Sequence, residues 1–296
     1  MNIGTRLLAT ACAVVLSAFV WIGTAQAAGC EALAALHLPH TTITLAESVG
    51  PGAFEPPTRA RGPGVPAAAF SGLPAFCRVA GTIRPTPDSD IRFEVWMPAA
   101  NWNGKFVGVG NGVWAGAISY FEMVAPLRQG YATAATDDGH QGSPLDASFA
   151  AGHPQKLIDF GYRAPHEMTV VAKATIAAFY RKAASRSLFA SCSTGGRQAL
   201  MEAYRYPTDY DGISAMAPAN PMVPLMVSSL WTGNAAMKDA ASRIPPAKFG
   251  LVHKAAVQAC DADDGVKDGI ISAPGRCHFD PAVLQCKGED AADCLT

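Results

Sequence analysis

Short segments of alternating hydrophobic and polar residues recur between residues 92 and 217. Residues 92–97 alternate and stop at Pro98, which is typical of a half-buried strand. Four further strands are predicted at residues 105–109, 131–136, 187–191 and 212–217, and two helices at residues 167–184 and 195–206. Strands that alternate with helices across short connections predict an α/β fold with a parallel-rich sheet flanked by helices.

Residues 1–27 have the pattern of a signal peptide. Arg6 precedes an apolar run at residues 7–22, and Ala25, Gln26 and Ala27 form a small-residue cleavage site. The run is shorter than the roughly 20 residues of a membrane span; an uncleaved anchor and acylation at Cys30 are the alternatives. We therefore expect a secreted or periplasmic protein, free of the membrane after cleavage.

The mature chain divides into two regions that differ in their pattern of predicted strands and helices. Residues 28–220 carry the strand and helix alternation, which loosens over residues 221–296 as expected for an insertion or a second domain. The net charge is −1 and no run of Lys and Arg occurs, which argues against a nucleic-acid partner. Nothing in the sequence indicates an oligomeric state.

The cysteines indicate a disulfide pattern. Cys12 leaves with the signal peptide, so seven of the eight cysteines remain, an odd number. Their spacing favours three pairs, and these are Cys30 with Cys77, Cys260 with Cys277, and Cys286 with Cys294. Cys192 is left over, and such a cysteine in an exported protein is free, paired between chains, or missing its partner.

A serine lies between a predicted strand and a predicted helix. Ser193 has small neighbours in the pattern Ser-x-Ser-x-Gly, one position away from the Gly-x-Ser-x-Gly of a nucleophile elbow. The Thr194 amide at the helix start would face a developing oxyanion, and the glycine-rich turn at residues 110–112 offers a second donor. The alternative is an ordinary Ser/Thr helix cap.

A second group of polar residues follows Cys260. Asp261, Asp263, Asp264 and Asp268 alternate with Gly265 and Gly269, a pattern that suits a hard cation bound by oxygen ligands. The EF-hand template does not fit, because Gly265 and Val266 occupy its fifth and sixth positions. A solvated acidic turn is the alternative, although the predicted Cys260–Cys277 bridge would clamp the ends of the loop.

Several segments together resemble the tannase and feruloyl esterase family, which includes mono(2-hydroxyethyl) terephthalate hydrolase. The segments that carry the resemblance are residues 102–106, 110–112, 136–140, 192–197, 206–213, 217–219 and 260–270. The resemblance extends from Cys30 to Thr296 and implies an α/β-hydrolase core with the start of an inserted lid domain.

The resemblance also implies roles for individual residues. Ser193 would be the nucleophile, with the amides of Thr194 and Gly112, or less closely Gly110, as the oxyanion hole. The lid would bind a structural Ca²⁺ remote from the serine. Its ligands would be the carboxylates of Asp261, Asp264 and Asp268 and the carbonyls of Val266 and Ile270, and no organic cofactor is expected.

The chain differs from the family pattern because the downstream half, which carries the Asp and His of the triad, is absent. In the family the triad runs Ser, Asp, His, and the cysteine after this histidine bonds the cysteine before the nucleophile, here Cys192. Neither His253 nor His278 matches that histidine, and His140 either lines the site or has a structural role near Asp137. We therefore expect a fragment truncated at the C-terminus, with Cys192 unpaired and no activity of its own.

The sequence thus predicts an exported serine carboxylic ester hydrolase that acts on esters of aromatic acids, such as feruloyl, galloyl or other phenolic esters, through a Ser193 acyl-enzyme. Two alternatives belong to other classes. One is a non-catalytic secreted binding module that keeps the cleft and the calcium site. The other is a calcium-stabilised structural domain in which Ser193 only caps a helix.

Overall fold

The structure is a computed structural model that describes residues 29–57 and 65–296. The predicted signal peptide, residues 1–27, lies outside the described residues. The chain forms two compact units, Met1–Ala219 and Asn220–Thr296, which are described separately below as the first and second units.

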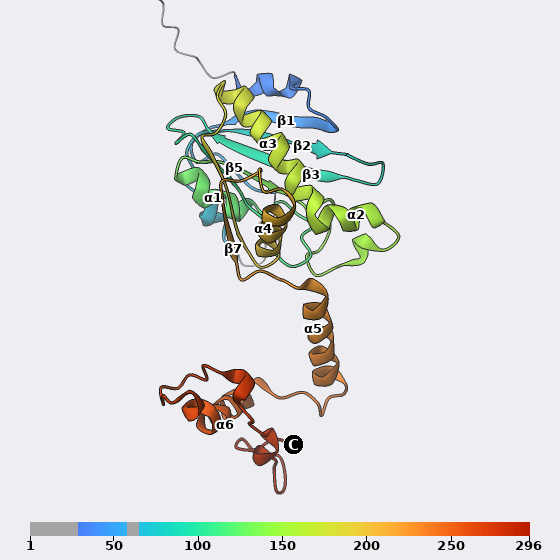
Figure 1. Cartoon of the computed structure of the whole chain (residues 1–296), viewed down its shortest axis with the longest axis vertical. Helices are drawn as coiled ribbons and strands as arrows, with labels where there is room; N and C mark the ends of the chain where they lie inside the picture. The colour runs from blue at the N-terminus through green and yellow to red at the C-terminus, as the bar shows by residue number, and fades with distance from the viewer. Residues whose placement is uncertain (1–28, 58–64) are drawn as a thin grey trace, which may run out of the picture. The chain divides into compact units, whose positions relative to one another are not determined.

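The first unit is built on a seven-stranded mixed sheet with the order β1-β2-β3-β5-β4-β6-β7 (Figure 1). The strands are β1 (Thr41–Val49), β2 (Phe76–Ile83), β3 (Ile91–Pro98), β4 (Lys105–Gly108), β5 (Ala132–Thr136), β6 (Arg186–Cys192) and β7 (Gly212–Met216). The pairings from β1 to β5 are antiparallel, and those joining β5, β4, β6 and β7 are parallel. The sheet is therefore parallel only over the half that carries the nucleophile candidate.

The five predicted strands are confirmed as β3 to β7, with ends that differ by one residue at most. The two predicted helices are α3 (Ala164–Tyr180) and α4 (Thr194–Arg205). α3 begins earlier than predicted and stops at Tyr180, because Arg181 adopts a left-handed conformation with φ 52°. The strands β1 and β2 and the helix α1 (Tyr120–Arg128) were not predicted.

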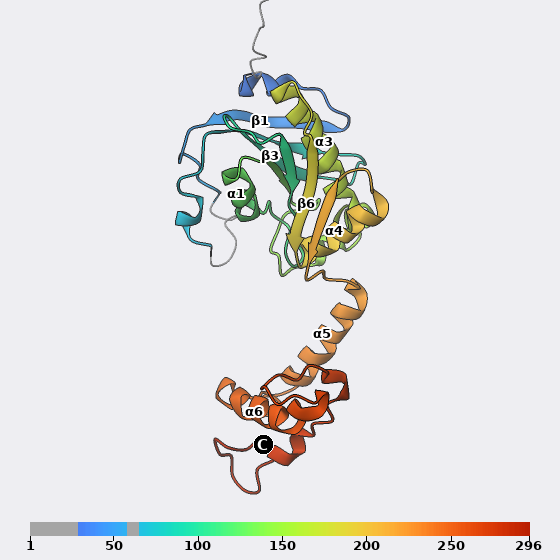
Figure 2. The ribbon, with the colours of Figure 1, turned by 60° about the vertical axis from the view of Figure 1, so that its left-hand side comes forward.

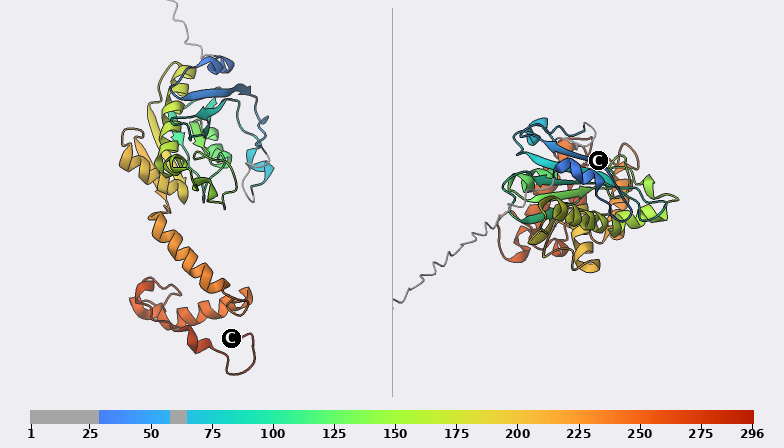
Figure 3. Two further views of the ribbon diagram at one scale, coloured as in Figure 1. Left: turned by 90° about the vertical axis from the view of Figure 1, so that its right-hand side faces the viewer. Right: turned by 90° about the horizontal axis from the view of Figure 1, so that it is seen from above.

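Helices cover both faces of the sheet (Figure 2). α3 and α4 lie on one face with η1 (Cys30–Ala35), which contacts α3 (Figure 3). α1 and η3 (Ala67–Phe70) cover the other face. Shorter helical segments precede α3, and these are η4 (Ser148–Ala150), α2 (Pro154–Ile158) and the π-helix η5 (Asp159–Arg163).

The central strand β3 contributes to both cores. Ile91, Phe93, Val95 and Met97 are buried with the α3 side chains Met168, Val171 and Ile176. The alternate residue Trp96 is buried with Phe54, Phe76 and Tyr120 on the opposite face. Because alternate residues of a strand point to opposite faces, one strand of almost wholly buried residues fills two apolar layers.

Glu94 is a buried carboxylate in the second of these layers. It accepts hydrogen bonds from Arg78 Nη2 at 2.6 Å, Trp96 Nε1 at 2.8 Å and the Tyr120 hydroxyl at 2.5 Å. Its side chain is 4% exposed, so these bonds replace almost all of its hydration. The carboxylate thus joins β2, β3 and α1 on the antiparallel half of the sheet.

The second unit consists of the helices α5 (Met222–Met237) and α6 (Phe249–Cys260) and of short 3-10 segments, with few buried residues. The short segments are η6 (Pro246–Lys248), η7 (Asp261–Asp264), η8 (Pro274–Arg276) and η9 (Pro281–Leu284). Cys260 and Asp261 are its most buried apolar and acidic residues. None of the helices within residues 29–57 and 65–296 combines the length and the apolar character needed to cross a membrane.

The three disulfides expected from spacing are present. They join Cys30 to Cys77, Cys260 to Cys277, and Cys286 to Cys294. Among the described cysteines, Cys192 alone has a free thiol, and it is exposed. The first disulfide ties η1 to β2, and the other two hold the sparse second unit together, where little apolar surface is buried.

The Glu94 network makes a testable contribution to stability. We expect Glu94→Ala to lower the free energy of unfolding by about 3 kcal/mol or more, because it leaves the Arg78 guanidinium without its buried partner. Urea unfolding followed by tryptophan fluorescence measures this change. The control is Asp90→Ala, which removes the exposed Arg84–Asp90 pair and should cost less than about 1 kcal/mol. Equal effects of the two substitutions would contradict the prediction.

Candidate active site

Ser193 lies at the sharp turn between β6 and α4. Its backbone has φ 61° and ψ −120°, a conformation that non-glycine residues rarely adopt. The Ser193 amide donates to the Met216 carbonyl at 3.1 Å, and its carbonyl accepts the Ala219 amide at 3.0 Å. These bonds to the end of β7 hold the turn, and Ser193 itself is exposed. This is the geometry expected of a nucleophile elbow.

Glycines make the turn possible through close approach of the backbone. A Cβ at Gly195 would lie 2.0 Å from Ser191 Oγ, and one at Gly196 would lie 2.4 Å from the Met216 carbonyl oxygen. A Cβ at Gly110 would lie 2.3 Å from Gln198 Oε1. No side chain fits at these positions, so α4 packs directly against β7 and against the turn after β4.

That turn is hydrogen-bonded to the start of α4. The Gly195 amide donates to the Asn111 carbonyl at 2.7 Å, and Thr194 Oγ1 donates to the Val113 carbonyl at 2.6 Å. Gln198 completes the attachment, since its Oε1 accepts the Asn111 amide at 3.1 Å and its Nε2 donates to Asn111 Oδ1 at 3.1 Å. The segment 110–113 is thus fixed relative to Ser193.

Two amides of this arrangement remain available. Within the described residues, neither the Thr194 amide nor the Gly112 amide donates a hydrogen bond to protein. The Asn111 amide between Gly110 and Gly112 is engaged by Gln198, so it is not available. Two such donors fixed by a rigid frame are what stabilises a tetrahedral oxyanion in acyl transfer.

Asp137 and Asp138 directly follow β5. Asp138 Oδ2 accepts Gln198 Nε2 at 2.6 Å and lies 3.9 Å from Arg197, a residue of α4. Burial raises the pKa of Asp138 to about 7, against the opposing charge of Arg197. Burial also raises the pKa of Asp137 to about 7, although Gln141, Gly139 and Arg92 donate hydrogen bonds to it.

His140 is buried and does not contact Ser193 by a hydrogen bond. Its ring stacks on Phe149 with centroids 3.6 Å apart, and burial lowers its pKa. In the described part of the chain both ring nitrogens lack a hydrogen-bond partner, and no imidazole bonds the Ser193 hydroxyl. His253 and His278 belong to the second unit. Among the described histidines of the first unit, none is therefore hydrogen-bonded to the nucleophile candidate as a general base.

A cavity of the first unit lies away from Ser193. It has a volume of about 1000 Å³ and is lined by β2 and β3 residues such as Arg92 and Glu94, together with Gly116 and Gln141. Ser193, Thr194 and Gly112 do not line it. We therefore do not assign this cavity to chemistry at Ser193.

The acidic loop of the second unit is folded on its own amides. Oδ1 of Asp261 accepts the Gly269 amide at 2.8 Å, Oδ1 of Asp264 accepts Val266 at 2.9 Å, and Oδ1 of Asp268 accepts Ile270 at 3.0 Å. The Val266 amide is the main reason that the pKa of Asp264 is lowered. Ser272 also donates to Asp264. Within the described residues the Oδ2 atoms of Asp261 and Asp268, and the carbonyls of Val266 and Ile270, accept no hydrogen bond.

Comparison with known proteins identifies the family. Residues 77–296 match the family model described as tannase and feruloyl esterase. The chain belongs to the tannase and feruloyl esterase family. The predicted α/β-hydrolase fold is confirmed by its structural neighbours in this family, which are esterases.

Three relatives illustrate the match. An uncharacterised esterase of Xanthomonas campestris is 45% identical over 269 residues, covering 91% of this chain and 45% of the relative. The "probable feruloyl esterase B" of Aspergillus clavatus is 35% identical, covering 75% and 42%. The crystal structure of feruloyl esterase B from Aspergillus oryzae superposes with a TM-score of 0.76 at 29% identity, covering 90% and 53%. The chain thus spans about half the length of these members of the tannase and feruloyl esterase family.

The sequence did not single out Asn111 and Gln198 as site residues. Both are uncharged, and each has an ordinary interpretation, as a turn residue and as a helix residue respectively. One signal could have identified Gln198. It is a polar residue whose helix neighbours Gly195, Gly196 and Ala199 are small, and a small-residue helix face permits close contact.

The raised pKa of the buried Asp138 carboxyl, which contacts the start of α4, can be tested. The pKa of its carboxyl is about 7 in the folded chain against an ordinary value of 3.8, so the folded chain holds a proton that the unfolded chain releases. The contribution of Asp138 to stability therefore falls as the pH rises from about 4 to 7. Between pH 5 and pH 8, we expect the free energy of unfolding to fall by at least ~1 kcal/mol less in Asp138→Asn than in the wild type. The reason is that a tenfold change in proton affinity corresponds to about 1.4 kcal/mol.

Urea unfolding at the two pH values measures the effect. Asparagine tolerates the φ of 68° at this position, so the substitution keeps the backbone. Asp146→Asn, at an exposed carboxylate of the same unit, is the control and should leave the pH dependence as in the wild type. A wild-type stability that does not fall relative to Asp138→Asn would refute the assignment.

Proposed function

We propose that the chain carries the nucleophile and the oxyanion hole of an exported serine carboxylic ester hydrolase. Ser193 is the nucleophile, and the amides of Thr194 and Gly112 stabilise the oxyanion. The main support is the exposed Ser193 at φ 61°, fixed beside two amides that have no partner in the described protein. Family membership adds to this support, because the relatives above are esterases by name.

The proposed reaction is acyl transfer through a covalent intermediate. Ser193 Oγ attacks the ester carbonyl, and the negative oxygen formed takes hydrogen bonds from Thr194 and Gly112. The alcohol then leaves, and water releases the acid from the acyl-enzyme. A base must take the serine proton first, and the resemblance implies that the Asp and His of the triad follow the lid in the longer relatives.

We further propose esters of aromatic acids as the substrates. The names of the fungal relatives, which are feruloyl esterases, support this class. Three disulfides support export to an oxidising compartment, which is also what the predicted signal peptide implies.

The second unit is proposed to begin the lid and to bind a structural Ca²⁺. The donor types fit, because Asp261, Asp264 and Asp268 offer carboxylate oxygens and the carbonyls of Val266 and Ile270 accept no hydrogen bond within the described residues. The three carboxylates do not form a group with ligand atoms within 4.8 Å of one another in this structure, so binding would have to draw them together. An all-oxygen set of this kind is what Ca²⁺ prefers. The Cys260–Cys277 disulfide joins the ends of the loop and limits how far the ligands would have to move.

Ser193 can be tested by covalent labelling of the mature chain, residues 28–296. We expect a fluorophosphonate to label Ser193, and added imidazole to increase the labelling rate by supplying the missing base. Intact-mass analysis and peptide mapping measure the adduct. Ser193→Ala should abolish labelling, whereas Ser229→Ala, at an exposed serine of α5, should leave it unchanged. Equal labelling of Ser193→Ala and wild type would rule out the nucleophile and favour the helix-cap alternative.

The same preparation tests for turnover. Because none of the described histidines of the first unit is hydrogen-bonded to Ser193, we expect methyl ferulate hydrolysis by residues 28–296 to equal that of Ser193→Ala. Chromatographic release of ferulate measures it. Hydrolysis well above the Ser193→Ala level would contradict this expectation and would require a histidine such as His140 to reach the serine.

The calcium proposal predicts a cation-dependent melting temperature. Ca²⁺ at about 100 times its Kd should stabilise the metal-binding unit by ~2.7 kcal/mol, and EDTA should reverse this. Calorimetry of the mature chain measures the shift. Asp264→Asn should remove the Ca²⁺ dependence, whereas Asp263→Asn, at the adjacent carboxylate outside the proposed ligand set, should keep it. A melting temperature insensitive to both Ca²⁺ and EDTA would count against the site.

A further inference from the structure

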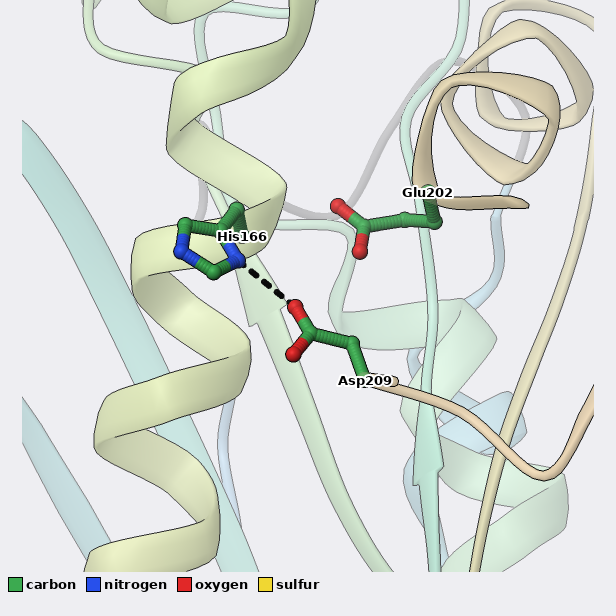
Figure 4. Close-up of side chains that lie close together, drawn as sticks. All are labelled: His166, Glu202 and Asp209. Atoms are coloured by element: carbon green, nitrogen blue, oxygen red, sulfur yellow. Dashed lines mark hydrogen bonds and ion pairs between the residues drawn. The ribbon is translucent and has the colours of Figure 1, made fainter. Parts of the chain in front are cut away.

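Three side chains with metal-binding atoms meet on the face of the first unit covered by α3 and α4. His166 lies in the first turn of α3, Glu202 in the last turns of α4, and Asp209 in the connection from α4 to β7 (Figure 4). One ligand atom from each lies within 4.8 Å of the others. His166 Nδ1 and Asp209 Oδ2 form a direct contact of 2.6 Å.

Glu202 is the unusual member of this group. Its residue is 0% exposed, and both carboxylate oxygens lack a hydrogen-bond partner in the described protein. Figure 4 shows the carboxylate directed toward His166 and Asp209. A buried carboxylate without a partner is costly, so its orientation toward two further ligand groups needs an explanation.

Protein cations do not supply that explanation. The Lys173 ammonium donates to the main-chain carbonyl of Asp209, not to a carboxylate of the cluster. Among the described residues, Glu202 has no ion pair, and the ion pair of Asp209 is with His166. Two acidic side chains therefore face one imidazole, and Lys173 acts on Glu202 only through its charge, without a hydrogen bond to either carboxylate.

We propose that His166, Glu202 and Asp209 bind a divalent transition-metal ion of the Zn²⁺ type. One imidazole nitrogen and two carboxylates form a mixed N/O set with three protein ligands, which suits Zn²⁺ and disfavours Ca²⁺, an ion that takes oxygen ligands. Zn²⁺ binds such ligands at about 2.0–2.2 Å, so the ion replaces the His166–Asp209 contact with small side-chain movements. Tyr206 stacks on the His166 ring at 3.7 Å and fixes its plane.

The site is separate from the nucleophile. Glu202 follows Ser193 by nine positions, which in an α-helix corresponds to about 14 Å along the axis and the opposite side of the helix. The His166–Asp209 pair consequently does not serve as the base of Ser193. The ion instead joins α3, α4 and the entry to β7, and so holds the helix whose first residues carry the elbow.

A zinc titration of the mature chain tests the proposal. The chain is stripped with EDTA, Cys192 is alkylated with iodoacetamide, and excess Ca²⁺ is present to occupy the acidic loop. We expect one Zn²⁺ per chain by isothermal titration and a raised melting temperature. Co²⁺ should give visible d–d absorption bands, which report nitrogen and oxygen ligands at the metal.

Substitutions locate the ion. Glu202→Gln keeps the shape of the side chain, and His166→Phe keeps the stacking on Tyr206, yet each removes a ligand and should weaken Zn²⁺ binding at least 10-fold. The control is His153→Gln, at an exposed His–Asp pair of 2.7 Å with Asp88 that has no third ligand, and it should leave binding unchanged. If Glu202→Gln does not fold, the half-buried His166 provides the decisive variant.

The outcomes that overturn the proposal are equally specific. Zn²⁺ binding that is absent in the wild type, or equal in wild type and His166→Phe, excludes the ion at this position. The unpartnered carboxylate of Glu202 would then mark a proton shared with Asp209 instead of a metal. Neither result depends on whether Ser193 is a nucleophile, because no esterase activity is measured.

Discussion

The first unit depends on the contact between the segment 110–113 and the first turn of α4. β4 and β6 are parallel neighbours, so both end at the same edge of the sheet and bring these two segments together. Contact at main-chain distance requires Gly110 and Gly195, where any Cβ would overlap a neighbour. Gln198 then bonds Asn111 through both atoms of its amide. This contact constrains Ser193 to the unusual backbone conformation that it adopts.

The parallel half of the fold was predictable because its signals are local. β4 and β7 are short apolar runs bounded by glycine, proline or aspartate, and β6 is a short run bounded by serines, which separates these strands clearly from the helices. In the antiparallel half, β3 was predicted but β1 and β2 were not. β1 carries Thr41, Thr42, Thr44 and Glu47 and so resembles a loop by composition. Its strand character comes from pairing with β2 over nearly its whole length. α1 was missed because Pro126 interrupts its helical pattern.

For the site, the sequence predicted residues that act near their own position in the chain. Ser193 and Thr194 are defined by one strand-to-helix turn, and the disulfides by the distance along the chain. His166 and Glu202 come from different helices, and Asp209 lies 43 positions after His166, so only the packing of α3 against α4 brings them together. Likewise, Asp138 is buried by the packing of α4 against it and not by its sequence neighbours.

The Cys30–Cys77 disulfide has a consequence for making the protein in the laboratory. It closes a loop that contains β1, an edge strand of the sheet, and a loop of this length is worth about 4 kcal/mol in the chain-entropy description. In the reducing cytoplasm of an expression host this disulfide does not form, so η1 and β1 lose their covalent attachment to β2. The unpaired edge of β2 is then a template for strand addition between molecules, which leads to inclusion bodies. Expression routed through an oxidising compartment preserves the edge and with it the soluble fold.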